Sequence, residues 1–146
     1  MAQEINLPEL DPDQVSPLNL AFIGDSVYEV IIRTLMLAQH NGSVKDVSER
    51  TSCYTRATAQ SRMILALETE LSESEHRIFK RGRNVKSIST PKSCTVSEYR
   101  HATGLEALIG YLYLNREYSR ILELVNRGIE LLDNNHMEKT DHDRIK

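Results

Sequence analysis

Two carboxylates, Asp25 and Glu106, lie within apolar segments of the sequence. A charge on the buried face of a helix must be paired, hydrogen-bonded or bound to a metal. Two carboxylates that meet across a helix interface repel each other unless a cation lies between them, and Mg²⁺ prefers such oxygen ligands. If the two segments pack together, the pair predicts a metal-assisted phosphodiester hydrolase, in which the metal activates water and stabilises the leaving oxygen. The alternative is structural: each carboxylate pairs with an arginine, such as Arg33 or Arg100.

The segment around Asp25 indicates a long helix from about Pro17 to about Gln39. Ser16 directly before Pro17 is typical of a helix start, because a capping hydroxyl is followed by proline at the first helical position. Gly24 costs about 1 kcal/mol relative to alanine inside a helix, which suggests that another part of the molecule comes close to the backbone there. The apolar residues recur at three- and four-residue steps and share one face. They are Leu20, Ile23, Val27, Val30 and Ile31.

The remainder of the chain indicates further helices, and it has no alternating strand pattern of useful length. The segment that carries Glu106 is apolar over most of its circumference, so we expect it to be central. The predicted fold class is all-α, with one folded domain over residues 16–133. The expected helices cover 44–51, 54–68, 72–82, 97–115 and 119–132, with an irregular lead-in at 1–15, a loop at 83–96 and a polar, disordered tail at 134–146.

Length and composition narrow the class of protein. A chain of 146 residues predicts a single domain, and a net charge of −3 means that any binding to a polyanion needs a local basic patch. Cys53 and Cys94 are the only cysteines, which favours a reducing cytoplasm over a disulfide scaffold. No signal peptide is indicated, and no apolar run reaches the ~18 residues of a membrane span. The histidines lack ligand spacing with either cysteine, so we do not expect zinc.

A basic stretch over residues 80–92 contains no acidic residue, in an otherwise acidic protein. Lysines and arginines with serine, threonine and asparagine donors suit contacts to phosphate groups. No aromatic residue lies within the stretch, which favours recognition of the shape and backbone of a duplex over base stacking. The alternative is a solvated charged loop. The candidate RNA-binding residues are Lys80, Arg81, Arg83, Asn84, Lys86 and Lys92.

Two motifs resemble the ribonuclease III superfamily. Its signature helix is similar to Leu20-Ala21-Phe22-Ile23-Gly24-Asp25-Ser26-Val27, and its second catalytic helix to Leu105-Glu106-Ala107-Leu108-Ile109-Gly110-Tyr111-Leu112-Tyr113-Leu114. The resemblance covers about residues 16–133. Ordinary ribonuclease III has a glutamate four residues before the signature aspartate and an aspartate three residues before the second-helix glutamate.

At these two positions the chain has Ala21 and Thr103. Both departures resemble the Mini-III subfamily, as do the basic stretch, Tyr99-Arg100 and the lack of a following double-stranded-RNA-binding domain.

The resemblance implies an all-α endoribonuclease that acts as a homodimer, with the signature helices near the two-fold axis and each subunit cutting one strand of an RNA duplex. Asp25 and Glu106 would be the catalytic, metal-binding carboxylates, and Mg²⁺ the cofactor. The basic stretch would contact the RNA backbone. The implied role is cytoplasmic maturation of the 23S ribosomal RNA precursor. Ala21 and Thr103 leave the number of metal ions open.

Two other interpretations remain. The first is a non-catalytic RNA-binding or ribosome-associated module that keeps the ribonuclease III fold, and the presence of both Asp25 and Glu106 argues against it. The second is a purely structural helical dimer, which leaves the acid-free basic stretch unexplained.

Overall fold

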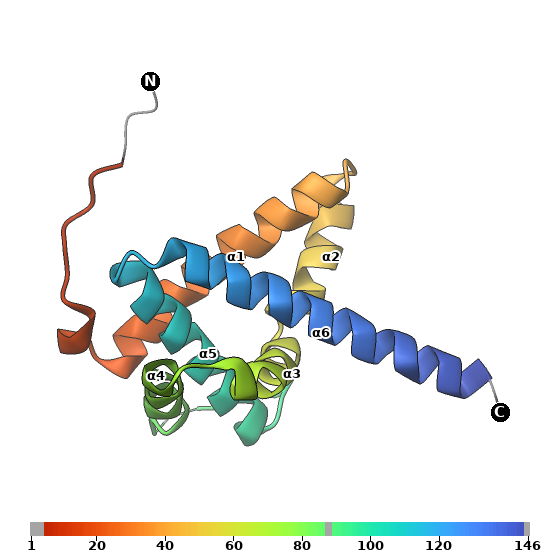
Figure 1. Ribbon diagram of the computed structural model, residues 1–146. Helices are drawn as coiled ribbons and strands as arrows, with labels where there is room; N and C mark the ends of the chain where they lie inside the picture. The colour runs from red at the N-terminus through yellow and green to blue at the C-terminus, as the bar shows by residue number, and fades with distance from the viewer. Residues whose placement is uncertain (1–4, 87–88, 145–146) are drawn as a thin grey trace.

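The computed structural model describes residues 5–86 and 89–144, without the side chains of 136–144. Within these residues every regular element is a helix, which confirms the all-α prediction (Figure 1). The elements are η1 (Pro12–Gln14), α1 (Pro17–Gln39), α2 (Val44–Thr55), α3 (Ala57–Leu67), η2 (Glu68–Glu70), α4 (Glu73–Arg83), α5 (Val96–Leu114) and α6 (Tyr118–Arg144).

The helix starts follow the capping signals in the sequence. The Ser16 hydroxyl accepts a hydrogen bond from the Asn19 amide (3.2 Å), and proline follows it at the first helical position. Capping boxes form at two other helix starts, one at Ser72 for α4 and one at Thr95 for α5. Local sequence therefore sets where these three helices begin.

The boundary between α2 and α3 lies at Arg56, a few residues later than the sequence predicts. Arg56 is the single non-helical residue between them, with extended backbone angles. The carbonyl of Tyr54, in the last turn of α2, accepts a hydrogen bond from the buried phenol of Tyr28 (2.6 Å). This contact with α1 satisfies a helix-end carbonyl and allows α2 to continue.

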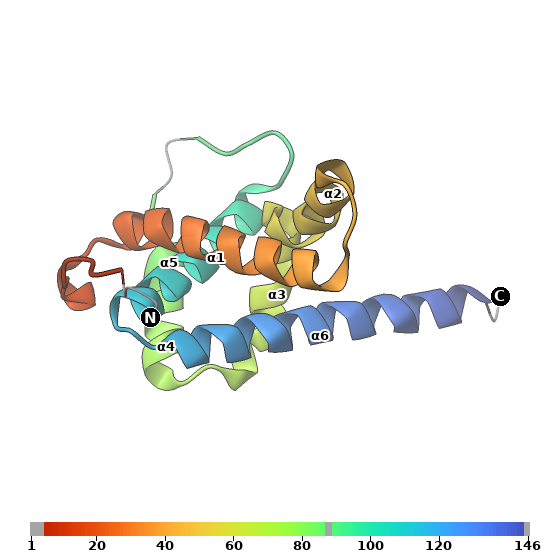
Figure 2. The same cartoon turned by 90° about the horizontal axis from the view of Figure 1, so that it is seen from above.

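Helix α6 is longer than the sequence analysis predicts. The sequence predicts that this helix ends at Leu132 and that a disordered tail follows. That prediction is wrong for residues 133–144, because α6 continues to Arg144. Polarity alone does not stop a helix, and this segment contains neither proline nor glycine. The second half of α6 extends beyond the other helices (Figures 1 and 2).

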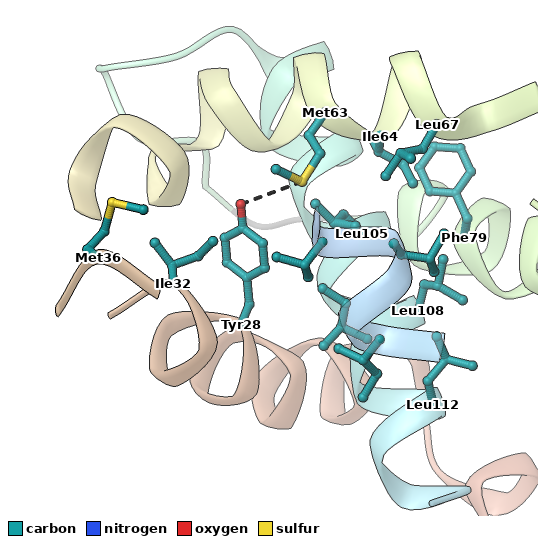
Figure 3. Close-up of a cluster of buried hydrophobic side chains, with 14 of the residues drawn as sticks. Tyr28, Ile32, Met36, Met63, Ile64, Leu67, Phe79, Leu105, Leu108 and Leu112 are labelled. Carbon is teal, nitrogen blue, oxygen red and sulfur yellow. Dashed lines mark hydrogen bonds between the residues drawn. The ribbon is translucent and has the colours of Figure 1, made fainter. Parts of the chain in front are cut away.

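Helix α5 lies at the centre of the fold, as its apolar circumference predicts. Helices α1, α3 and α4 pack directly on it, and α6 covers α3 and part of α5 (Figure 2). The main core cluster contains buried side chains from all of the helices α1 to α6, and Figure 3 shows part of it. Its largest fully buried side chains include Tyr28, Phe79, Ile32, Met63, Ile64, Leu67, Leu105, Leu108 and Leu112.

A partly buried ion pair joins the start of α4 to α6. The Glu75 carboxylate accepts hydrogen bonds from Arg120 Nε (2.8 Å) and from the Ser72 amide (2.8 Å). The Arg120 guanidinium holds the pKa of Glu75 below its ordinary value. Among the helices described, none is both long and apolar enough to cross a membrane.

Candidate active site

The crossing of α1 and α5 has no room for side chains at two glycines. A Cβ atom on Gly24 would overlap the backbone carbonyl of Glu106, and one on Gly110 would overlap the carbonyl of Leu20. The two helix backbones therefore touch, which explains why α1 carries a glycine in its middle. Because Asp25 follows Gly24 directly, this contact brings it to the part of α5 that carries Glu106.

The two carboxyl groups influence each other electrostatically. Burial, and after it the negative charge of Asp25, raises the pKa of Glu106 to about 8. The pKa of Asp25, which is exposed, is also raised, first by partial burial and then by Glu29 one turn later. Asp25 therefore ionises first, and its charge then opposes the ionisation of Glu106.

The arginine pairing that the sequence left open does not occur. Arg33 instead pairs with Glu29 on the outer side of α1 (3.0 Å). Within the described part of the chain, neither Asp25 nor Glu106 has an ion-pair partner or accepts a side-chain hydrogen bond. Two adjacent carboxylates without a protein cation fit a hard divalent metal ion, which prefers oxygen ligands.

The phenol of Tyr28 is buried near Glu106. Its pKa is raised by burial and then by the charge of Glu106. Its hydroxyl points to the Tyr54 carbonyl and contacts the Met63 sulfur (3.7 Å) (Figure 3). The Tyr28 hydroxyl therefore stays protonated and hydrogen-bonded to Tyr54, and its ring lowers the polarity around Glu106.

The two positions that differ from ordinary ribonuclease III supply no further ligand. Ala21 is buried in a small apolar cluster with Leu20 and Ala107. The hydroxyl of Thr103 donates to the Tyr99 carbonyl on its own helix (2.9 Å). In residues 5–86 and 89–144 no group of three or more histidine, cysteine or acidic side chains could hold a metal ion. One chain therefore offers two carboxylates at this site.

The basic stretch is partly helical. Lys80, Arg81 and Arg83 lie in the last turn of α4, where positive charge also favours the helix dipole, and Asn84 follows as the C-cap. Lys86 and Lys92 are exposed on the connection to α5. Residues 87 and 88 lie outside the described residues. In Figure 2 this connection arches away from the body on the side opposite α6.

The structure adds three polar residues that are not among the candidate RNA-binding residues, although Arg100 belongs to the Tyr99-Arg100 pair of the Mini-III resemblance. Ser97, Arg100 and His101 lie on the first turns of α5, beside Arg83 and Asn84 at the end of α4. Their spacing of three and four residues places them on one face of a helix, and this signal was available in the sequence. Their meeting with α4 was not, because it depends on how the two helices pack.

Comparison with known proteins identifies the family. The model of the ribonuclease III domain matches residues 18–117, which include both carboxylates and the whole basic stretch. The chain belongs to the ribonuclease III family. It is therefore an endoribonuclease.

Relatives within the ribonuclease III family support the Mini-III resemblance. Mini-ribonuclease 3 of Thermoanaerobacter sp. (strain X514) is 44% identical over 119 residues, which cover 82% of this chain and 84% of the relative. Mini-ribonuclease 3 of Clostridium tetani is 41% identical over 84% of this chain and 82% of the relative. A crystal structure of a Fusobacterium nucleatum protein has a TM-score of 0.74 at 35% identity, covering 82% of this chain and 96% of that one.

Proposed function

We propose that this enzyme is a Mg²⁺-dependent endoribonuclease that cleaves double-stranded RNA, with residues 16–133 as its catalytic domain. Its substrate is the 23S ribosomal RNA precursor in the cytoplasm. The observation that carries the proposal is that the crossing of α1 and α5 brings Asp25 and Glu106 close enough for their charges to interact, with no described ion-pair partner for either carboxylate.

Asp25 and Glu106 would hold the metal ion, with water and RNA phosphate oxygens as its remaining ligands. A bound Mg²⁺ would supply an activated water and stabilise the leaving oxygen. Asp25 would be the first of the two carboxylates to ionise, because the large rise in pKa is that of Glu106. Glu106 must lose its proton before it can act as a ligand, since burial and Asp25 raise its pKa to about 8.

The basic stretch would bind the RNA backbone through Lys80, Arg81, Arg83, Asn84, Lys86 and Lys92. None of these residues pairs with a carboxylate in the described part of the chain. Their charges are therefore available to phosphate groups, and such contacts position a duplex without reading its sequence.

The apolar stripe of α1, formed by Leu18, Phe22, Val30 and Leu37, supports a homodimer. These large side chains are exposed and recur at steps that keep them on one side of the helix. Asp25, three residues after Phe22, borders the stripe. A second copy that covered the stripe would bring two carboxylate pairs near one interface, one for each strand of a duplex.

The proposal is tested by incubating the purified protein with a long RNA duplex and Mg²⁺, followed by gel analysis of the products. The wild type should cleave the duplex. Asp25→Asn and Glu106→Gln should each lose activity by several orders of magnitude, because each removes a charged metal ligand. Glu73→Gln, which removes an exposed carboxylate at the start of α4, should cleave as the wild type does.

The result also separates enzyme from binding module. A protein that binds the duplex without cutting it, or that cuts equally well as Asp25→Asn, would favour the non-catalytic RNA-binding module. Cleavage of single-stranded RNA at the same rate as duplex would contradict the proposed substrate class.

A further inference from the structure

A hollow lies between the C-terminal end of α4 and the first turns of α5. We call it the α4–α5 hollow, and its volume is about 410 Å³. No acidic residue lines it. The lining residues are Arg83, Asn84, Val96, Ser97, Arg100 and His101.

The two arginines of the hollow carry uncompensated charge. Neither Arg83 nor Arg100 has a carboxylate partner among the described residues. Four other arginines of the fold do pair with glutamates: Arg33, Arg116, Arg120 and Arg127. The hollow is thus a local concentration of free positive charge in an acidic protein, and it favours an anion.

Several side chains of the hollow, Arg83 and His101 above all, are held in place. The guanidinium of Arg83 lies over the Phe79 ring (5.5 Å to the centroid), and its Nε donates to Asn84 Oδ1 (3.2 Å). The His101 ring stacks against the same Phe79 (6.2 Å between centroids, 19° between planes). Ser97 Oγ lies 3.4 Å from His101 Nδ1. These contacts restrain Arg83 and His101 before a ligand binds, which reduces the entropy that these two side chains lose on binding.

The start of α5 adds backbone donors to the same place. The Thr95 hydroxyl caps the amide of Glu98. No described group accepts a hydrogen bond from the amides of Val96 and Ser97, two of the residues that line the hollow. Unsatisfied amides at the positive end of a helix bind oxyanions. Lys80, Arg81 and Arg83 offset the negative end of α4 nearby.

We propose that the α4–α5 hollow binds one backbone phosphate of the RNA, and that this phosphate is not the one that is cleaved. The inference rests on the proposed action on duplex RNA. Guanidinium groups match phosphate oxygens in pairs, which favours phosphate as the anion.

The residues of the hollow and Glu106 lie at different positions on α5, which separates the bound phosphate from the cleavage site. Arg100 lies six residues before Glu106, roughly 9 Å along the helix axis. Ser97 lies nine residues before Glu106, which places the two on opposite sides of the helix. Glu106 faces α1, whereas the hollow faces α4. Arg100 and His101 are therefore binding residues that position the RNA and leave the chemical step to the carboxylates.

The test uses Arg100→Gln, because Arg100 is exposed and its loss should leave the fold intact. Binding of a labelled RNA duplex is measured by fluorescence anisotropy in EDTA at several KCl concentrations. We expect the affinity to fall roughly tenfold at low salt, and the slope of log K against log salt to become shallower by ~0.9, the value for one phosphate contact on a duplex. In cleavage assays KM should rise and kcat stay unchanged.

Two matched variants sharpen the result. Arg116→Gln removes the same charge at the opposite end of α5, roughly 24 Å away, and should bind as the wild type does. Arg100→Lys should recover most of the salt dependence but not all of the affinity, because lysine keeps the charge and loses the paired donors.

A third measurement uses no RNA. Titration of the full chain with inorganic phosphate, followed by NMR of the His101 ring, should shift its signals saturably in the wild type and not in Arg100→Gln. No saturable shift would overturn the proposal. The proposal would also be overturned if the wild type cleaved duplex RNA but Arg100→Gln and Arg116→Gln bound the duplex equally well. That outcome would leave the proposed function intact. A wild type that neither binds nor cuts a duplex would instead contradict the proposed function.

Discussion

Gly24 of α1 lies directly against the backbone carbonyl of Glu106 in α5, so that no Cβ atom fits between the two helices. The same contact is repeated one step further along the crossing, where Gly110 meets the carbonyl of Leu20. The position of the carboxylate pair therefore depends on a backbone contact that contains neither carboxylate. Packing at the glycines and chemistry at Asp25 and Glu106 are coupled.

Gly24→Ala should destabilise the protein in spite of the higher helix propensity of alanine. The gain of about 1 kcal/mol from propensity is outweighed, because two backbones must separate and overpacking costs typically 1–3 kcal/mol or more. Urea denaturation should show a net loss of stability. Gly42→Ala is the matched control: its Cβ would meet only the flexible side chain of Asp46, at 3.3 Å. Equal stability of Gly24→Ala and the wild type would contradict the close crossing.

The raised pKa of Glu106 predicts a stability that falls as the pH rises. Between its ordinary value of 4.5 and about 8, the folded state holds a proton on Glu106 that the unfolded state has lost. Unfolding therefore releases this proton within the window, so the free energy of unfolding falls as the pH rises towards 8, by at most ~1.4 kcal/mol per pH unit.

Glu106→Gln should abolish the pH dependence of stability that comes from Glu106. The stability of this variant should therefore depend less steeply on pH than that of the wild type. Denaturation in EDTA at several pH values measures the difference, and the contribution of the histidines cancels because both proteins contain them. Parallel curves would show that Glu106 ionises normally in the folded state.

Mg²⁺ should stabilise the wild type by binding only the folded protein. At a concentration one hundred times the Kd the gain is about 2.7 kcal/mol, and Tm rises by ~2–4 °C per kcal/mol for a chain of this size. The rise should be larger at pH 8.5 than at pH 6, since Glu106 must give up its proton to bind the ion. Asp25→Asn and Glu106→Gln should show little rise. An equal rise in these variants would place the metal elsewhere.

Phe22→Asp should convert the proposed dimer into a monomer with its fold intact. The Phe22 side chain is 79% exposed in the single chain, so the variant loses little internal packing, whereas a charge on the apolar stripe opposes association. Light scattering after size-exclusion chromatography measures the mass, and circular dichroism the fold. Val44→Asp changes an apolar residue that is 87% exposed at the start of α2 and should leave the mass unchanged. A monomeric wild type would contradict the dimer.

Several features of the fold could be predicted from short segments. The capping hydroxyls of Ser16, Ser72 and Thr95 mark three helix starts, because each cap is a contact between residues three apart. The spacing of apolar residues indicates α1 and the central place of α5. The end of α6 could not be predicted in this way. Its last residues carry no stop signal, and polar composition does not distinguish a helix from a coil.

The candidate site shows the same division. The sequence by itself determined that Asp25 and Glu106 are the two carboxylates in apolar segments, that a glycine precedes Asp25, and that residues 80–92 carry positive charge alone. Only the tertiary structure decided what surrounds them. In the folded protein Arg33 forms an ion pair with Glu29, and burial raises the pKa of Glu106. The packing of α4 on α5 places Arg100 and Arg83 at the same hollow. The reason is physical: residue type and spacing specify one helix face, whereas pairing, burial and charge coupling depend on which faces meet.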